Sequence, residues 1–358
     1  MTRILDHALR VGASRLGHPQ LIYAHYGVTH RCNMRCRMCD VWKSGAPELE
    51  LTVSQASLLA ENLHRAGAIN VALGGGEPFV RKDLSELVFS FSKRSLEVRV
   101  LTNGIGVREQ RIREVIDAGL QHVSISLDTL DPVKQSYIYN GVDVWADIVQ
   151  AMRRFRAWLP ERSAPVVNVC VSRINIDELD KIVDFAAGEG FLCSFVPIAL
   201  SSSSEQADGF AAVAPDLAFG PDDQDRITTA YDKLLERKLG GAPIANSSRF
   251  LRDSKTHLLD STHPWHCDAG TLYLSVSPEG NISICHHFPA FARFDTPDLK
   301  SLLRNPDLRR EFAAQRSSCD GCMRPCWTEV THAVHDLFAG LEAVLSMRTA
   351  ARMTRGKS

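Results

Sequence analysis

Six short apolar segments rich in β-branched residues lie between residues 20 and 200, separated by segments with helical periodicity. The strand-like segments span residues 21–28, 69–73, 98–102, 122–127, 166–171 and 192–198. Helical periodicity is clearest at 53–66, 84–92, 108–118 and 176–190. This alternation is typical of βα units that build a parallel sheet. Six units predict an α/β fold, a partial (β/α)6 barrel that is an incomplete version of the TIM barrel.

Three cysteines follow the first predicted strand, with three and then two residues between them: Cys32, Cys36 and Cys39. Three thiolates can hold three irons of a [4Fe–4S] cluster and leave the fourth iron open to a ligand that is not protein. A structural zinc site needs a fourth thiol or imidazole, and His30 is the only candidate that close in the sequence. The spacing therefore favours an iron–sulfur cluster over zinc.

Polar residues follow the next three predicted strands, at the edge where parallel α/β barrels carry their active sites. Three glycines and Glu77 follow the second strand, and Asn103 lies in a Thr-Asn-Gly turn after the third. In the fourth strand, alternation places Ser124, Ser126 and Asp128 on one face. Hydroxyls and a carboxylate in a row suit the diol of a ribose. Each segment alone also fits an ordinary turn or a half-exposed strand, so the predicted binding site depends on their combination.

Taken together, these motifs resemble the radical S-adenosylmethionine (radical SAM) superfamily over residues 20–200. The resemblance implies that the open iron of the cluster chelates the amino and carboxylate groups of S-adenosylmethionine. An electron passed from this cluster into the sulfonium then leaves methionine and a 5′-deoxyadenosyl radical, which abstracts hydrogen from a substrate.

The resemblance also assigns the cofactor-binding residues. It implies that Gly75, Gly76 and Glu77 meet the methionine amino group, and that Ser126 and Asp128 lie near the ribose. Asn103 and Ser124 belong to the same expected site. Met38 precedes the last cysteine, where the family often has an aromatic residue against adenine, and its thioether can also pack on a base.

Five more cysteines lie late in the chain: Cys267, Cys285, Cys319, Cys322 and Cys326. With Gly280 five positions before Cys285, they resemble the SPASM/twitch extension of many radical SAM enzymes, which carries auxiliary iron–sulfur clusters. Two auxiliary clusters need more cysteines, so the resemblance implies one auxiliary [4Fe–4S] cluster. The favoured ligands are Cys267, Cys285, Cys319 and Cys322. Cys326 could replace Cys319, or its thiol could face the substrate.

Two further cysteines, Cys170 and Cys193, lie on the fifth and sixth predicted strands. A thiol gives up a hydrogen atom readily, so Cys170, Cys193 and Cys326 are candidate hydrogen donors to a substrate radical. Buried cysteine acting as a small apolar side chain is the alternative. Histidines flank some late cysteines at positions 266, 286 and 287, where surface or supporting roles are commoner than ligation.

Three functions are consistent with these features. The first is hydrogen abstraction from a small metabolite, such as a sugar, aminocyclitol or nucleoside, leading to dehydrogenation, epimerisation or decarboxylation. The second is maturation of a ribosomal peptide by a crosslink, thioether or epimerisation. Only 31 residues precede Cys32, which favours the first because many peptide maturases have a leader-binding domain there. The third is a non-enzymatic iron–sulfur electron carrier, in which the cofactor motifs would have no function. The expected partners are the substrate and a reductant such as flavodoxin or ferredoxin.

Composition sets the remaining expectations. The chain has 358 residues and a net charge of −1, which gives no general attraction to nucleic acid, and no segment reads as a membrane helix. Ten cysteines without a signal segment predict a reducing, cytoplasmic location. We expect an N-terminal helical segment (1–19), the partial barrel (20–200), a loop or lid with a connecting helix (201–262), the auxiliary-cluster part (263–330) and a C-terminal helix (331–358).

Overall fold

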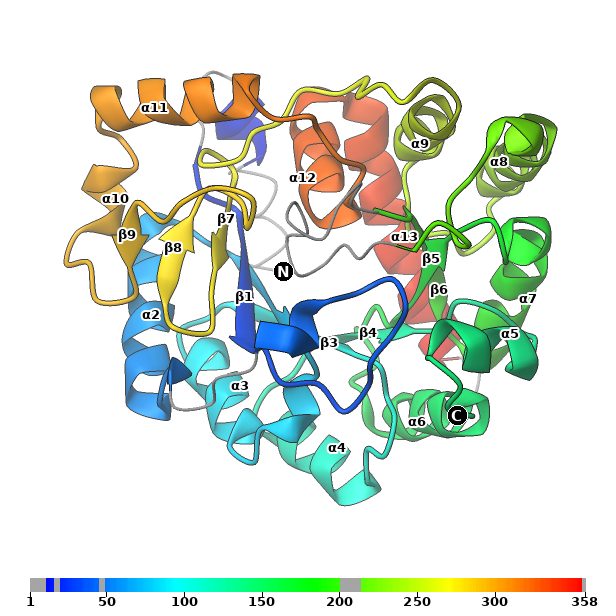
Figure 1. Cartoon of the computed structure of the whole chain (residues 1–358). Helices are drawn as coiled ribbons and strands as arrows, with labels where there is room; N and C mark the ends of the chain where they lie inside the picture. Colours follow the sequence, from blue (N-terminus) through cyan, green and yellow to red (C-terminus); the bar gives the residue numbers. More distant parts are fainter. Residues whose placement is uncertain (1–10, 16–19, 45–48, 200–213, 356–358) are drawn as a thin grey trace.

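The computed structural model describes residues 11–15, 20–44, 49–199 and 214–355. Its centre is one nine-stranded sheet with the order β6-β5-β4-β3-β2-β1-β7-β8-β9 (Figure 1). The strands are β1 Tyr23–Thr29, β2 Asn70–Gly75, β3 Glu97–Thr102, β4 His122–Ser126, β5 Val166–Val171, β6 Leu192–Pro197, β7 Tyr273–Val276, β8 Asn281–Ser283 and β9 Ala292–Arg293. Strands β1 to β6 are all parallel, which confirms the six predicted strands and the α/β fold.

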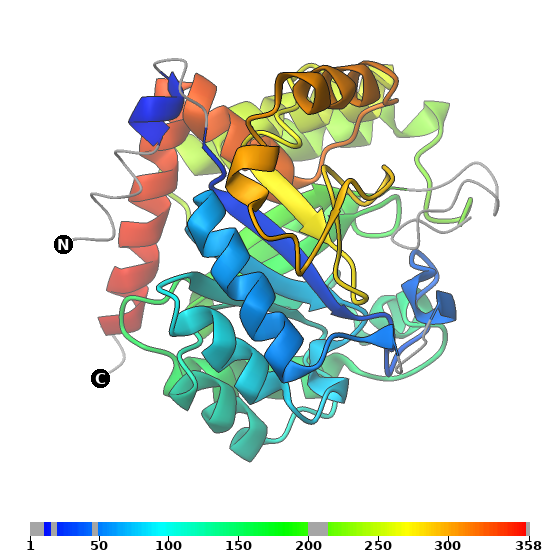
Figure 2. The same ribbon diagram turned by 90° about the vertical axis from the view of Figure 1, so that its left-hand side faces the viewer.

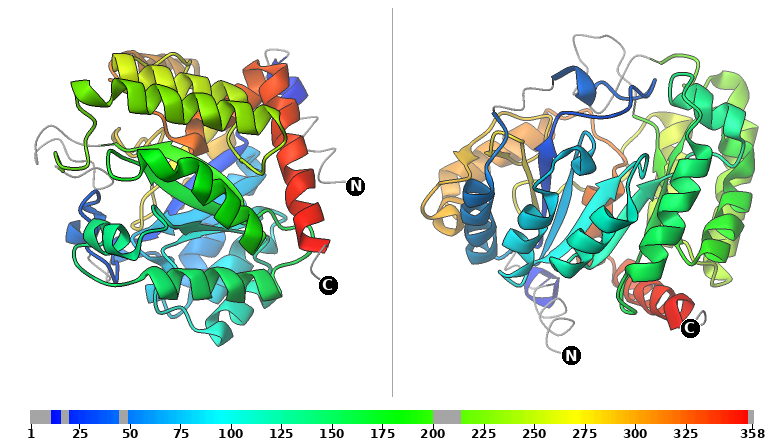
Figure 3. Two further views of the ribbon diagram at one scale, coloured as in Figure 1. Left: turned by 90° about the vertical axis from the view of Figure 1, so that its right-hand side faces the viewer. Right: turned by 90° about the horizontal axis from the view of Figure 1, so that it is seen from below.

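The helices follow the predicted alternation over the first half of the chain. Figures 2 and 3 show α2, α3, α4, α6 and α7 arranged on the outer face of the curved sheet, whereas α5 contacts the loop after β1. Their bounds are α2 Val53–Ala66, α3 Leu84–Ser92, α4 Glu109–Asp117, α5 Pro132–Ile138, α6 Trp145–Trp158 and α7 Leu179–Glu189. The later helices are α8 Gln224–Leu239, α9 Ser248–Asp260, α10 Leu299–Leu302, α11 Pro306–Ser317, α12 Pro325–His335 and α13 Leu337–Arg355.

Burial alternates along the central strands and separates two faces of the sheet. Val98, Val100, Val123 and Ile125 are fully buried in the main hydrophobic core beneath the outer helices. The residues that alternate with these buried side chains on β3 and β4, such as Ser124, are only half-buried, and β5 shows the same alternation. Since neighbouring side chains of a strand point to opposite faces, the concave face is lined by polar groups.

The sheet does not close into a barrel, and its β6 edge is covered by an irregular segment. Cys193 in β6 donates its N–H to Pro243 at 2.8 Å and accepts the N–H of Ala245 at 2.7 Å. The Asn246 side chain accepts the N–H of Phe195 at 2.7 Å. These bonds satisfy backbone groups that an open sheet edge would expose. Beyond this segment, α8 and α9 pack together, as Figure 3 shows.

The late strands join the sheet beside β1 rather than forming a separate layer. Strand β7 is parallel to β1, with Tyr23 opposite Tyr273, and β8 and β9 continue antiparallel. The part of the chain with the late cysteines therefore shares a sheet with the part that carries Cys32, Cys36 and Cys39.

One predicted helix is wrong in its extent. We expected a single C-terminal helix (331–358), whereas α12 begins at Pro325 and ends at His335, and α13 begins at Leu337. Asp336 between them is extended, and its carboxylate accepts the N–H groups of Phe338 at 2.8 Å and Ala339 at 3.1 Å. Such an acceptor caps the start of a new helix, and sequence periodicity alone does not reveal the break.

Two expected segments are only partly described. Residues 11–15 of the expected N-terminal helix are helical, and 1–10 and 16–19 lie outside the described residues. Of the expected lid, 200–213 also lie outside them, whereas Leu217 is buried and accepts the N–H of Arg173 at 3.1 Å. Among the described residues, no helix is both long and apolar enough to cross a membrane.

Candidate radical and iron–sulfur centres

The cysteine loop (residues 30–40) begins directly after β1 and packs on the end of β2. Gly76 donates its N–H to Thr29 at 2.7 Å, and Glu77 donates its N–H to Arg31 at 2.9 Å. A Cβ on Gly76 would lie 2.1 Å from the Arg31 carbonyl oxygen, so only glycine permits this approach. Gly75 has a φ of +109°, which also favours glycine. The glycines therefore hold the cysteine loop and Glu77 together.

Cys32, Cys36 and Cys39 lie close enough in this loop for their charges to interact. Burial raises the pKa of the Cys36 thiol, and Cys39 and Cys32 add to this rise. Burial likewise raises the pKa of Cys39 to about 11. Three partly buried thiols with raised pKa values become thiolates readily only when a cation binds them, as metal ligation requires.

Glu77 is a buried carboxyl that accepts hydrogen bonds from three donors. Its oxygens accept the Thr102 hydroxyl at 2.8 Å, the Asn103 N–H at 2.8 Å and the Phe79 N–H at 3.0 Å. Burial nevertheless raises its pKa to about 7. A carboxylate has about four acceptor positions, so one remains for a further donor.

Asp128 is a second buried carboxyl, at the end of β4. Its Oδ1 accepts the N–H of Cys170 at 2.8 Å. Its Oδ2 has no hydrogen bond among the described residues, although the Gln135 amide lies near it. Burial raises the pKa of Asp128 to about 7. A buried oxygen without a donor costs free energy, which a ligand hydroxyl would relieve.

The other expected cofactor residues lie around these two carboxyls. The Asn103 amide donates to Asn33 Oδ1 at 2.8 Å and lies 4.0 Å from Cys32 Sγ. Ser124 accepts a hydrogen bond from Arg99 at 3.1 Å, deeper in the sheet. Ser126 is half-buried on the same face, and Met38 is half-buried against the core beside the cysteine loop.

Tyr139, which the sequence analysis missed, belongs to the same neighbourhood. It is buried at the end of α5, directly before the left-handed Asn140. Burial raises its pKa, and Asp128, Cys36, Cys32 and Glu77 each add to the rise. No motif marks this residue, because the fold alone brings α5 over the cysteine loop.

The late cysteines lie together beside β7 and α12. Burial raises the pKa values of Cys267, Cys285 and Cys322, and Cys267 and Cys322 influence each other and Cys285. Cys319 is exposed but also acts on Cys267 and Cys322. The five thiols thus form a single group, which extends from the exposed Cys319 to the buried side of α12.

A repeated backbone contact distinguishes most of these cysteines. Their sulfurs accept an N–H from the residue two positions later, and the donors are Met34, Val41, Ala269, His287, Gly321 and Arg324. The acceptors are Cys32, Cys39, Cys267, Cys285, Cys319 and Cys322. Backbone donors favour the charged thiolate, the form that binds metals. Cys326 instead lies in the first turn of α12 and accepts the N–H of Trp327.

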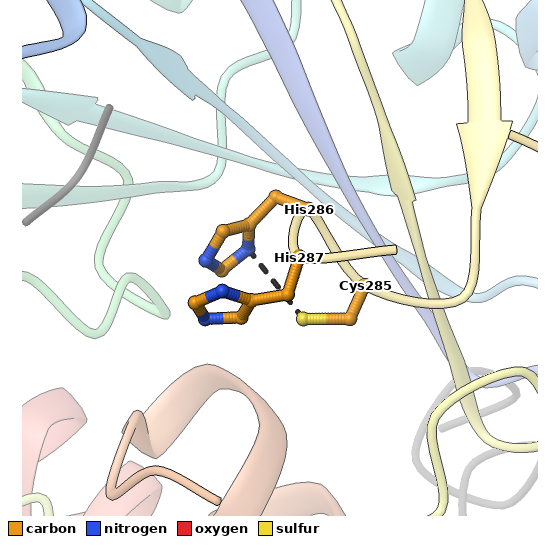
Figure 4. Close-up of side chains that lie close together, drawn as sticks. All are labelled: Cys285, His286 and His287. Atoms are coloured by element: carbon orange, nitrogen blue, oxygen red, sulfur yellow. Dashed lines mark hydrogen bonds between the residues drawn. The ribbon is translucent and has the colours of Figure 1, made fainter. Parts of the chain in front are cut away.

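Cys285 lies next to two histidines in the turn after β8. Figure 4 shows His286 and His287 beside the Cys285 thiol, with their rings tilted by 37° and their centroids 4.4 Å apart. The Cys285 sulfur and His286 Nδ1 are 3.6 Å apart. The three side chains are close enough to hold one metal ion, but the neighbouring late cysteines offer a softer donor set suited to an iron–sulfur cluster.

The first turn of α12 lies between the two cysteine groups. Burial raises the pKa values of Cys39, Cys170, Cys322 and Cys326, and the Arg324 guanidinium opposes this rise at each of them. The ring of Trp327 stacks on Tyr273 at 4.7 Å and meets the edge of His25 in β1 at 6.2 Å. The two groups therefore border the same region of the molecule.

Cys170 and Cys193 occupy different surroundings. Cys170 is half-buried on the concave face beside Asp128. Cys193 is fully buried in the main hydrophobic core. Only the first has the cofactor-site carboxyl as a neighbour.

Comparisons with known proteins agree with this geometry. A family model described as the radical SAM superfamily matches residues 26–186. The structure is similar to SuiB of Streptococcus suis, with a TM-score of 0.64 and 13% identity, covering 87% of this chain and 72% of that one. It is also similar to anSMEcpe with bound AdoMet and Cp18Cys peptide, with a TM-score of 0.58 and 14% identity, covering 94% of this chain and 99% of that one.

Proposed function

Because residues 26–186 form a domain of the radical SAM superfamily, whose members bind a [4Fe–4S] cluster and S-adenosylmethionine, we propose that Cys32, Cys36 and Cys39 hold that cluster here. The bound cluster would supply the electron that cleaves S-adenosylmethionine to a 5′-deoxyadenosyl radical. One observation carries the proposal: the cysteine loop brings Cys32 near Glu77, which has an acceptor position remaining, and Cys36 near Asp128, which has an oxygen without a donor.

The chain's own residues would bind and orient the cofactor. Glu77 accepts a hydrogen bond from the methionine amino group, with Gly75 and Gly76 allowing close approach. Asp128 Oδ2 accepts a ribose hydroxyl, and Ser126 lies on the same face. Tyr139 covers the group from α5 and helps to exclude water, which a reactive radical requires.

A variant with Cys36→Ala tests this assignment. We expect it to lose reductive cleavage of S-adenosylmethionine by dithionite-reduced protein, measured as 5′-deoxyadenosine under anaerobic conditions. Cys193→Ala serves as the matched control, because Cys193 is buried in the core, and it should retain cleavage. Cleavage at the wild-type rate by Cys36→Ala would contradict the proposal.

As substrate we propose a small polar metabolite of the sugar, aminocyclitol or nucleoside type. The supporting observation is the concave face, where Ser124, Asn168 and Cys170 are half-buried while their strand neighbours are fully buried. A peptide is the second candidate, since the similar structures include SuiB bound to precursor peptide SuiA and anSMEcpe with a peptide. Incubation with deuterated metabolites and peptides, followed by detection of deuterium in 5′-deoxyadenosine, distinguishes them.

For the late cysteines we propose one auxiliary [4Fe–4S] cluster held by Cys267, Cys285, Cys319 and Cys322. The support is the N–H donor two residues after each of these four sulfurs, an arrangement that Cys32 and Cys39 share with them. Reconstituted protein should bind about eight irons, and Cys319→Ala about four. Cys326→Ala should keep about eight. Loss of iron from Cys326→Ala would instead make Cys326 the fourth ligand.

We keep Cys170 and Cys326 as candidate hydrogen donors. Cys170 lies beside Asp128. Cys326 lies near Tyr23 in β1: burial is the main cause of the raised pKa of Tyr23, and Cys326 adds to it. A variant that keeps its iron and cleaves S-adenosylmethionine but forms no product would identify the donor. Cys193 is left out of this proposal because apolar side chains surround it.

The reductant is proposed to dock on a basic rim (Arg35, Arg37, Lys82 and Arg108) around the cysteine loop. All four side chains are exposed, and none forms an ion pair within the described part of the chain. Lys82 and Arg108 line a cavity of about 290 Å³ together with Asn33 of the loop. An acidic electron carrier such as flavodoxin or ferredoxin complements this charge.

Charge reversal tests the docking site. Lys82→Glu with Arg108→Glu should slow flavodoxin-driven cleavage of S-adenosylmethionine roughly tenfold at low ionic strength, with the difference shrinking in high salt. Dithionite-driven cleavage should be unchanged, since dithionite needs no docking. Lys300→Glu, an exposed cation in α10, is the matched control. Equal flavodoxin-driven rates for the wild type, the double variant and Lys300→Glu would contradict docking at the basic rim.

A further inference from the structure

One late cysteine sulfur receives a hydrogen bond from a buried hydroxyl group. Tyr273 Oη lies 3.1 Å from Cys267 Sγ; Tyr273 is fully buried and Cys267 is half-buried. The Cys267 sulfur also accepts the N–H of Ala269, as the other proposed ligands accept theirs. Cys285, Cys319 and Cys322 have no hydroxyl donor among the described residues. The tyrosine therefore makes Cys267 different from its partners.

The direction of the hydrogen bond follows from proton counting. A cysteine sulfur bound to iron carries no proton, so it can only accept. The phenol has one proton, and its oxygen already accepts the Asp268 N–H at 3.2 Å. Thr331 also lies near the Tyr273 hydroxyl, but its Oγ1 forms no hydrogen bond among the described residues, so Cys267 Sγ is the acceptor within hydrogen-bonding distance of the Tyr273 proton when iron is bound.

The surrounding fold keeps the hydroxyl in this position. Tyr273 begins β7, pairs with Tyr23 of β1, and its ring stacks on Trp327 at 4.7 Å with an angle of 21°. In the turn before it, Gly270 donates its N–H to the Tyr273 carbonyl at 3.0 Å. A Cβ on Gly270, whose φ is +80°, would lie 2.6 Å from Ile284. The turn thus fixes the backbone of Tyr273, and the stack on Trp327 orients its ring.

We propose that Tyr273 is a positioning residue that raises the reduction potential of the late cluster through its hydrogen bond to Cys267. The proposal rests on the auxiliary cluster put forward above. Reduction adds negative charge to an iron–sulfur cluster, and a donor to a ligating sulfur stabilises the reduced form more than the oxidised form. A higher potential makes the late cluster a better electron acceptor during turnover.

The experiment uses the full chain with Cys32, Cys36 and Cys39 replaced by Ala, so that only the late cluster contributes. Redox titration followed by electron paramagnetic resonance compares this parent with its Tyr273→Phe variant. We expect an unchanged iron content and a shift of the midpoint potential to a more negative value. An exchangeable proton coupled to the reduced cluster should also disappear. Tyr26→Phe is the matched control, because the buried Tyr26 hydroxyl has no partner among the described residues.

A second variant separates hydrogen bonding from packing. Incorporation of 3-fluorotyrosine at position 273 keeps the ring and gives a stronger donor, so the potential should shift to a more positive value. Equal potentials for the parent, Tyr273→Phe and the fluorinated protein, each with intact iron, would overturn the proposal. A parent without iron would overturn the auxiliary cluster itself, and this inference with it.

Discussion

At the scale of single residues, the proposed cofactor site contains two carboxyls whose burial costs free energy in the protein alone. Glu77 and Asp128 are both buried, and burial raises the pKa of each to about 7. Neither has a cationic partner among the described residues. A ligand with an amino group and hydroxyls would supply the missing donors. Binding of the proposed cofactor would thus offset the cost of burying these two carboxyls.

The pH dependence of stability tests the state of Glu77. Its pKa in the folded protein, about 7, exceeds the ordinary 4.5, so the folded state holds an extra proton between these values. The free energy of unfolding should therefore fall as pH rises through this window, by on the order of 3 kcal/mol. Glu77→Gln cannot ionise and should lack this part of the fall. Urea unfolding of the iron-free proteins at several pH values measures the difference, and parallel profiles would contradict it.

At the scale of elements, close backbone contact joins the end of β2 to the cysteine loop. Gly76 approaches the Arg31 carbonyl, and the hydrogen bonds from Gly76 and Glu77 tie the two segments together. The proposed iron ligands and Glu77 are therefore positioned by the same contact, which explains why glycines rather than larger residues precede this glutamate.

Gly76→Ala should disturb both functions of this contact. The added Cβ would lie 2.1 Å from Arg31 O, so the loop must shift, at an expected cost of at least about 2 kcal/mol. Reconstituted protein should lose the first cluster and retain about four irons. Gly188→Ala is the control, since a Cβ there meets nothing within 4 Å, and it should be neutral or stabilising by up to about 1 kcal/mol. Full iron content in Gly76→Ala would contradict this account.

At the scale of the whole molecule, one sheet carries both proposed centres. Strand β7 pairs with β1, and the Tyr23 N–H donates to Leu272 at 3.1 Å. The Asn62 side chain in α2 donates to the Phe294 carbonyl at 2.9 Å, and Trp327 of α12 packs against His25. Residues 20–200 supply the proposed ligands of the first cluster and residues 263–330 those of the late cluster. We propose that the two ranges fold together.

Cooperative unfolding is the consequence. Because strands from both ranges share hydrogen bonds and core contacts, the iron-free protein should show one calorimetric transition. Amide hydrogen exchange in β4 and in β7 should report the same opening free energy. Two transitions, or a lower opening free energy confined to β7, would show that the late part folds separately.

Sequence patterns alone determined the six parallel strands, because alternation and helical periodicity are local and directly readable. The spacing of Cys32, Cys36 and Cys39 likewise indicated its chemistry, since one short loop supplies all three thiols. Tertiary structure decided what depends on distant segments meeting. It brings β7 beside β1, sets Tyr139 over the cysteine loop, ends α12 at Asp336, and places the Tyr273 hydroxyl beside the Cys267 sulfur. These contacts join residues whose separation along the chain carries no pattern, so only the folded chain reveals them.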